Sequence, residues 1–503
     1  MDIVLLSSIF AVIAAIYFYL TKRYSYWRDQ GIPCPKGIFP GFGHMWPMIS
    51  MRMNISDFIQ HIYNSQPNCS MVGFYNKMTP SLVVRDPELV KTVMQTNFSN
   101  FSDNMFLLDP HLDPLLSLNP FFSNGEMWNA SRKRLARAFS SMRMKLLFGC
   151  IEQVCDEFED YLDRCLNSGV SEYELKDLFS KYTGEFVANG AFGVKGFCFK
   201  HDKAQSQTSF QTIGNLIFDS SLLNRIMVNL TFLLPKLTKI FRISFLPKEV
   251  DRFIRSTVKE ILRHRQQENP KRNDFFQLMM DLDKNEDGVY DERALAADTL
   301  SFFLDGYETT SITLSFIGYQ LARHPQVLQK LREEVESVLA KHDGRMTYES
   351  LEKMTYMDQV ISESQRLYTV LAVMPKFCTK EIELKGSDGL CCRLQPGMMV
   401  IIPAHAIHMD SKYWLDVETF DPDRFAADKK TEIDKYAFLP FGKGPRMCVG
   451  MRMGILQMKV FLATFVRRYT LELSPKTQLP LKMLPGTVMT TPASGLWATI
   501  KRL

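Results

Sequence analysis

The chain has 503 residues, with 46% hydrophobic and 23% charged side chains and a formal net charge of +5. This composition excludes an intrinsically disordered protein and supports a large buried core. The charge is modest and the basic residues are not interleaved with aromatic ones as in single-strand binders, so we expect no nucleic-acid partner.

The chain opens with an uncharged stretch of 18 residues, 3–20. As a helix this stretch would rise ~27 Å, close to the ~30 Å hydrocarbon thickness of a bilayer. Asp2 precedes it and Lys22, Arg23 and Arg28 follow it, so the positive-inside bias would leave the rest of the chain in the cytosol. A membrane anchor is therefore favoured, with a cleaved leader as the alternative.

These features predict an organisation in three parts. Residues 1–22 form the anchor, residues 23–45 with their three prolines form an extended linker, and residues 46–503 form one globular domain. The ten cysteines fall in no Cys-x-x-Cys or zinc-finger spacing. In a cytosolic domain we expect them to be reduced.

Two further stretches each have two interpretations. Residues 230–247 mix apolar residues with three basic ones, as interfacial membrane segments do, although a buried loop or helix fits equally well. DKNEDG, Asp283 to Gly288, matches four positions of an EF-hand calcium loop. Ala294 occupies the position of the required bidentate glutamate, so a solvated acidic turn is favoured over a calcium site.

Apolar residues recur with helical spacing from 291 to 323 and predict one long helix, which ends at His324-Pro325. DGYETT, Asp305 to Thr310, lies in its middle. Gly306 costs about 1 kcal/mol against Ala in a helix interior, and threonine hydroxyls can bond back to carbonyls one turn earlier. We therefore expect a local opening of the helix, which would make a groove with polar groups.

A buried ion cluster is predicted farther along the chain. ESQR places Glu363 and Arg366 on one face of a helix, and FDPDRF supplies Arg424 from a loop. A carboxylate shared by two arginines is reasonable because the guanidinium is planar and stays charged. Each motif occurs by chance in many proteins, but together they favour the cluster.

FGKGPRMCVG, residues 441–450, places three glycines and a proline around Cys448. Behind the anchor, the order DGYETT, ESQR, FDPDRF, FGKGPRMCVG resembles a membrane-bound cytochrome P450, a haem-thiolate monooxygenase, over essentially the whole chain. The sequence is similar in style to insect microsomal detoxification members. The resemblance implies a mainly α (α+β) fold, with a large helical haem domain, a small β-rich lobe and one N-terminal transmembrane helix.

The resemblance implies haem b with Cys448 as the axial thiolate ligand of the iron, and Phe441, Gly442 and Gly450 as further residues of the haem-binding loop. Glycines let a backbone approach the ring closely and adopt φ > 0. The N–H groups that follow the cysteine begin a helix and support the thiolate charge.

The haem propionates are expected against Trp128, Arg132 and Arg446, because charge-assisted bonds from arginine suit a carboxylate. Lys376 stands where the family usually has another arginine. Lysine keeps the charge but lacks the planar fork, so the resemblance is weaker at this contact.

Thr309 and Glu308 match the family's hydroxyl and acid that deliver protons during oxygen activation. Asp305 stands where the family has Ala or Gly, four residues before Thr309, so both should face the pocket. A hydrogen-bonded role for Asp305 is favoured, and recognition of a protonated amine such as an alkaloid is the alternative.

By resemblance the substrate pocket is mostly apolar, and a lipophilic small molecule follows. The residues expected to line it, besides Asp305, are Phe106, Val370, Met374 and Val488.

The resemblance also implies electron-transfer partners at the endoplasmic reticulum membrane. Basic residues crowd 132–145, and Lys443, Arg452 and Lys459 flank the thiolate loop; they form either a solvated face or a docking surface for an acidic donor. That donor would be NADPH-cytochrome P450 reductase, with cytochrome b5 as a further candidate.

The predicted activity is NADPH-dependent insertion of one oxygen atom into a xenobiotic, such as a plant alkaloid or insecticide, or into an endogenous lipid. The alternatives are a haem-thiolate isomerase or dehydratase without a reductase, and an anchored haem- or calcium-binding module without turnover.

Overall fold

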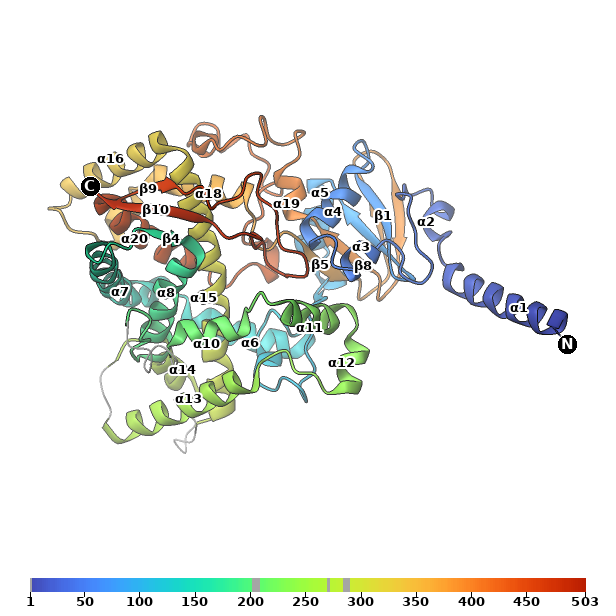
Figure 1. Ribbon diagram of the computed structural model, residues 1–503, viewed down its shortest axis with the longest axis horizontal. Helices are drawn as coiled ribbons and strands as arrows, with labels where there is room; N and C mark the ends of the chain where they lie inside the picture. Colours follow the sequence, from blue (N-terminus) through green and yellow to red (C-terminus); the bar gives the residue numbers. More distant parts are fainter. Residues whose placement is uncertain (1, 201–208, 269–271, 284–289) are drawn as a thin grey trace.

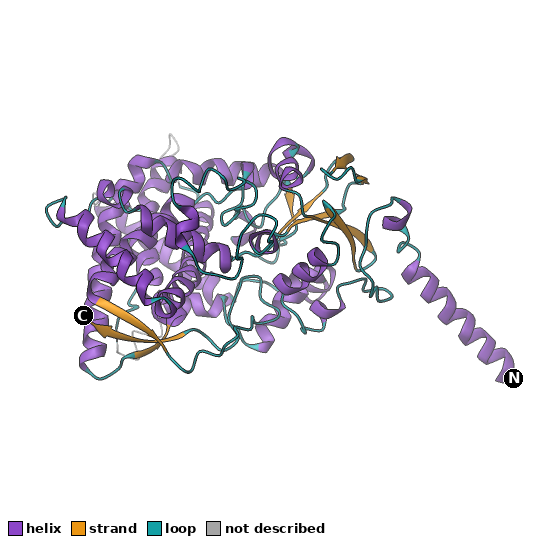
Figure 2. Cartoon of the chain, turned by 90° about the horizontal axis from the view of Figure 1, so that it is seen from above, coloured by secondary structure: helices purple, strands orange, loops and turns teal. Residues whose placement is uncertain are grey.

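The computed structural model describes residues 2–200, 209–268, 272–283 and 290–503. They form a large helical body and a smaller β-rich lobe, which lies between the body and the N-terminal helix (Figure 1). The strands gather in two places, one in the lobe and one near the C-terminus on the body (Figure 2). This is the mainly helical α+β architecture that the sequence predicts.

The N-terminal helix α1 (Asp2–Thr21) projects away from the rest of the molecule (Figure 1). Residues Ile3–Thr21 have a mean hydropathy of 2.5, and none of the stretch is buried against the protein. Within the described residues this is the one straight helix that is long and apolar enough to cross a bilayer.

Residues 23–45 are partly packed onto the lobe. They contain the short helix α2 (Tyr26–Asp29), whose Trp27 is fully buried and donates from its indole N–H to the Phe74 carbonyl at 2.9 Å. At Gly73 a Cβ would come within 2.4 Å of the Trp27 ring, so only glycine leaves room for the indole. This contact holds the segment that follows α1 against the sheet of the lobe.

The lobe is built on a five-stranded sheet in the order β1-β2-β8-β5-β3. β2 and β8 run parallel, with Leu82 opposite Val400, and the other neighbours are antiparallel. Short helices α3 (Trp46–Ile49), α4 (Ile55–Asn64), α5 (Pro87–Lys91) and α19 (Ala404–His408) accompany it. The strands of this sheet and of the hairpin β6–β7 are β1 (Met71–Asn76), β2 (Thr79–Val84), β3 (Asp103–Asn104), β5 (Met374–Phe377), β6 (Ile382–Lys385), β7 (Cys391–Leu394) and β8 (Met399–Ile402).

The body packs its helices around α15 (Glu292–Arg323), and a second sheet of β4 (Glu172–Glu174), β10 (Trp497–Arg502) and β9 (Tyr469–Leu473) closes one side. The other helices are α6 (Gly125–Ala138), α7 (Ser141–Asn167), α8 (Leu175–Val187), α10 (Phe210–Ile217), α11 (Leu222–Leu233), α12 (Pro235–Phe241), α13 (Lys248–Glu268), α14 (Phe275–Asp283), α16 (Pro325–Ala340), α17 (Tyr348–Glu352), α18 (Thr355–Leu367) and α20 (Met451–Arg468).

Helix α15 confirms the long helix predicted for 291–323 and runs through the middle of the body (Figure 1). Asp291 caps it by accepting from the Ala294 N–H at 3.0 Å. The local opening expected at Gly306 is wrong, because α15 is helical throughout. The Thr309 hydroxyl does bond back to the Asp305 carbonyl, at 2.6 Å, but the helix accommodates this bond on its surface.

Candidate active site

A cavity of about 290 Å³ lies between α15, α6, β5 and the loop that leads into α20. Most of its lining is apolar, with Phe106, Phe121, Phe139 and Phe302 among the aromatic contributors. One cysteine, Cys448, faces this space from the loop. The arrangement combines a mostly hydrophobic pocket with one thiol.

The loop around Cys448 is held in a conformation that requires glycine. Gly442 and Gly444 have φ of 68° and 70°. A Cβ on Gly444 would lie 1.9 Å from the Met94 carbonyl oxygen, so this turn passes too close to the neighbouring backbone for any side chain. The Cys448 N–H then donates to the Phe441 carbonyl at 2.9 Å and closes the loop.

Gly450 caps α20, and its N–H donates to the Cys448 sulfur. Gly450 itself has an ordinary φ of −90°, and a Cβ there would meet no protein atom within 4 Å. Burial raises the pKa of the Cys448 thiol to about 11, and the charge of Asp305 adds to this, while the Gly450 N–H and Arg132 oppose it. The donors that favour a thiolate are therefore in place around the sulfur.

Three cations line the same cavity. Arg446 donates to three backbone carbonyls and to the Asn124 side chain, and its guanidinium lies 4.4 Å over the Trp128 ring. Burial, followed by the charge of Arg446, lowers the pKa of Lys376 to about 7. Arg132 is the third, and burial lowers its pKa as well.

None of these three cations forms an ion pair with a carboxylate in the described part of the chain. Buried cations need an anionic partner, and a ligand that carries carboxylates at one edge supplies it. A haem, with two propionates and an iron that binds thiolate, fits both this edge and Cys448. The fold and site thus define a cysteine-ligated haem protein.

Comparison with known proteins agrees with this class. The family model described as Cytochrome P450 matches residues 33–498. Probable cytochrome P450 6a13 of Drosophila melanogaster is 34% identical over 482 residues, 95% of this chain and 94% of the relative. Cytochrome P450 6a2 of the same species is 31% identical, and the match covers 100% of this chain and 99% of the relative. Cytochrome P450 9e2 of Blattella germanica is 30% identical, and the match covers 97% of this chain and 95% of the relative. The chain belongs to the cytochrome P450 family.

Proteins of this family hold haem through a cysteine thiolate, and the bound group supplies the redox chemistry of a monooxygenase with electrons from a reductase. In this chain Cys448 would hold the iron. Arg132, Lys376, Arg446 and the Trp128 side chain would hold the propionate edge.

The two residues expected to deliver protons lie on different faces of α15. Thr309 lines the cavity, whereas Glu308 is buried outside it. The Lys176 ammonium of α8 lies 2.9 Å from Glu308 Oε1, and Glu308 Oε2 has no hydrogen-bond partner. Burial raises the pKa of Glu308 despite Lys176. The Thr309 hydroxyl therefore faces the cavity, and the Glu308 carboxyl lies on another face of α15.

Most of the expected pocket residues do line the cavity. Phe106, Val370 and Met374 contribute to its wall. Val488 is partly buried against the helical core and is not among the lining residues. Asn119 lines the cavity from the loop before α6; it belongs to the stretch 104–122 that the resemblance places at the pocket, but no pattern in the sequence distinguishes this asparagine from others.

Asp305 faces the cavity from α15, as its spacing from Thr309 predicts. Asn119 Nδ2 lies 3.3 Å and 3.2 Å from its two carboxylate oxygens. Burial raises the pKa of Asp305 to about 7, and the Asn119 bond opposes this rise. A carboxylate with a raised pKa therefore lies in a wall that is mostly apolar.

Glu363 and Arg366 are fully buried in α18 and pair through two bonds of 2.8 Å. Arg424, in the loop after α19, adds a third contact from Nε to Glu363 Oε1 at 3.2 Å. The structure thus brings all three residues together.

Several basic residues of the expected docking surface are not available on the outside. Arg134 is paired with two aspartates, Lys459 is buried, and Arg132 lines the cavity. Lys133 and Arg137 remain exposed on α6. The patch is therefore smaller than the sequence suggests.

The stretch that resembled a calcium loop, Asp283 to Gly288, lies for the most part outside the described residues, since 284–289 are not among them. Among the residues that the structure describes, no group of three or more His, Cys, Asp or Glu side chains is arranged to hold a metal ion.

Proposed function

We propose that the protein is an NADPH-dependent monooxygenase that inserts one atom of dioxygen into a lipophilic small molecule. The substrate would be a xenobiotic, such as a plant alkaloid or insecticide, or an endogenous lipid. The observation that carries the proposal is the common cavity of Cys448 and Thr309 with a largely apolar wall. Family membership supports the reaction type.

The thiolate assignment is tested with Cys448→Ala against Cys391→Ala, a cysteine exposed on β7 away from the cavity. The reduced carbon monoxide spectrum of the wild type should carry the red-shifted thiolate band, and Cys448→Ala should abolish both this band and turnover. Cys391→Ala should retain both. Oxygenase turnover in the Cys448 variant would refute the assignment.

The reductase dependence is tested separately. A monooxygenase needs NADPH and a flavin-containing reductase, with cytochrome b5 as an additional donor to examine. An isomerase or dehydratase would turn over a peroxide substrate without either, so activity that is indifferent to NADPH would favour that second function.

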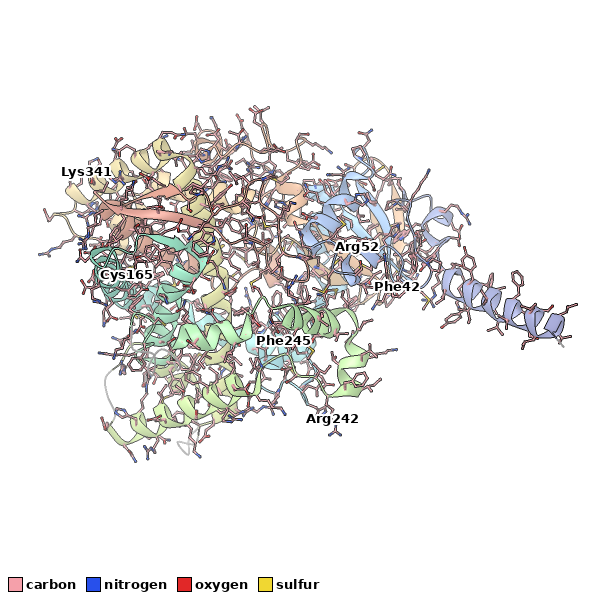
Figure 3. All side chains as sticks on the ribbon, in the orientation of Figure 1. Phe42, Arg52, Cys165, Arg242, Phe245 and Lys341 are labelled. Carbon is pink, nitrogen blue, oxygen red and sulfur yellow. The ribbon has the colours of Figure 1, made fainter. Side chains whose placement is uncertain are left out.

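We further propose a single-pass protein of the endoplasmic reticulum membrane, with residues 23–503 in the cytosol. Besides α1, exposed apolar side chains support lipid contact. The Phe42 and Trp46 rings meet edge to face in the lobe, with centroids 5.1 Å apart, and on α12 Ile240 and Phe241 are 70% and 69% exposed next to Arg242. Phe42 and Arg242 lie toward the α1 end of the molecule (Figure 3).

A further inference from the structure

The wall of the cavity contains one carboxylate, Asp305, whose role the proposed reaction does not explain. Its side chain opens on the cavity while the helix around it is buried. No lysine, arginine or histidine of the described residues forms an ion pair with it. An ionised carboxylate without a cation in such a place is costly, so it calls for a positively charged partner or a proton.

The orientation of Asp305 is fixed by Asn119. Asn119 is fully buried, and its Oδ1 accepts from the Phe121 N–H at 2.7 Å. Because this bond uses the amide oxygen, the amide nitrogen must point the other way, toward both oxygens of Asp305. The carboxylate therefore stays at the cavity, and its remaining lone pairs are available there.

Two of the three cations that line the cavity are bonded to other groups, and the third, Arg132, interacts with the charge of Cys448 and forms no ion pair with Asp305 among the described residues. Arg446 is bonded to backbone carbonyls and Asn124, and Lys376 donates to Asn104. The same cavity is lined by aromatic rings, with Phe106 and Phe121 stacked at 5.4 Å and Phe302 one turn before Asp305 on α15. A negative group beside aromatic faces suits a cation that carries an apolar body.

We propose that Asp305 is a specificity-determining residue that binds the cationic nitrogen of an amine substrate, while the apolar part of that substrate packs against Phe106 and Phe121. This inference rests on the proposed monooxygenase function and names its substrate class. Since Thr309 lies one turn away on the same face of α15, the carbons bonded to that nitrogen lie closest to the reacting space.

Two probes of the same shape separate charge from fit. Trimethyl(2-phenylethyl)ammonium is a permanent cation that cannot ligate iron through nitrogen, and (3,3-dimethylbutyl)benzene replaces its nitrogen by carbon. Binding of both to the full-length, haem-loaded protein is measured by calorimetry for the wild type and for Asp305→Asn, which keeps the side-chain shape and can still accept from Asn119.

Asp305→Asn should weaken binding of the cation roughly tenfold or more and change binding of the neutral probe less than about twofold. Asp298→Asn is the matched control: it removes a carboxylate two turns away on α15 that pairs with Arg134 outside the cavity. It should leave both affinities within about twofold.

Equal losses for the two probes in Asp305→Asn, or no loss for either, would overturn the proposal and leave Asp305 as a partner of Asn119 only. A loss of cation binding in Asp298→Asn as large as that in Asp305→Asn would overturn it too, because a general field effect would then explain the preference. The carbon monoxide spectrum, recorded on the same samples, reports independently on the thiolate. A missing thiolate band with retained cation selectivity would therefore refute the proposed function and not the amine site.

Discussion

Arg366→Ala is expected to remove the most completely bonded side chain that we find in the helical body. All five N–H groups of the Arg366 guanidinium are used. Nε and Nη2 each donate to Glu363 at 2.8 Å, Nη1 donates to the His408 and Val417 carbonyls at 2.9 Å and 2.8 Å, and Nη2 also donates to the Thr419 carbonyl at 3.2 Å. Arg366 and Glu363 are both fully buried.

The substitution leaves Glu363 in the interior with one arginine contact, from Arg424 at 3.2 Å, and one backbone donor, the Asp421 N–H at 3.1 Å. Removing one partner of a buried ion pair costs about 3–5 kcal/mol, and the three abandoned carbonyls act in the same direction. Since folded domains are stable by only ~5–15 kcal/mol, about a fifth or more of the free energy of unfolding would be lost.

Denaturant unfolding, followed by helical circular dichroism and by the haem absorbance, measures the effect. Lys330→Ala is the control, because the Lys330–Asp423 pair has a similar 2.8 Å contact but both side chains are about half exposed, and such pairs contribute ~0–1 kcal/mol. If Arg366→Ala lost no more stability than Lys330→Ala and kept its haem, the reasoning about the buried cluster would be refuted.

Two further predictions concern the supports of the thiolate loop. Gly444→Ala should lower haem retention strongly, because φ is 70° and the new Cβ would meet the Met94 carbonyl oxygen at 1.9 Å; a variant with wild-type haem content would contradict this. Burial lowers the pKa of His408 well below the usual 6.5, and its Nε2 accepts from the Leu439 N–H at 2.8 Å. The unfolded chain then binds the extra proton first, so stability is complete above pH 6.5 and should fall by up to about 1.4 kcal/mol per pH unit below it. If His408→Gln and the wild type showed the same pH dependence of the unfolding free energy from pH 7.5 to 5.5, this role would be excluded.

Contacts and motifs are predicted most reliably from the sequence where they join residues that are close in the chain. Glu363 and Arg366 are three residues apart on one helix, so their pairing follows from helix geometry alone. Cys448 and its glycines are close in the chain, and a loop that must turn twice through positive φ is recognisable there. The family, the fold class and the long helix α15 follow from the same kind of pattern and are confirmed.

Prediction is weaker where contacts join distant segments. Asn119 reaches Asp305 across 186 residues, and nothing near either position indicates the pair. The basic character of the stretch 132–145 is visible in the sequence, but the carboxylates that neutralise Arg134 come from α14 and α15. A charge pattern counts side chains and leaves out the partners that tertiary structure brings to them, so it overestimates an exposed surface.

The helix geometry of α15 also explains why the two residues expected to deliver protons, Glu308 and Thr309, do not lie together in the structure. Neighbouring residues on an α-helix are turned by about 100°, and in the unbroken helix α15 this turn points Thr309 into the cavity and Glu308 away from it. Glu308 therefore meets Lys176 on α8, while residues four apart share a face and Asp305 joins Thr309. The acid assigned by resemblance to proton delivery and the acid that meets the cavity are two side chains with different partners. Burial raises the pKa of both acids, and different neighbours oppose this rise: a lysine ammonium for Glu308, and the neutral amide of Asn119 for Asp305.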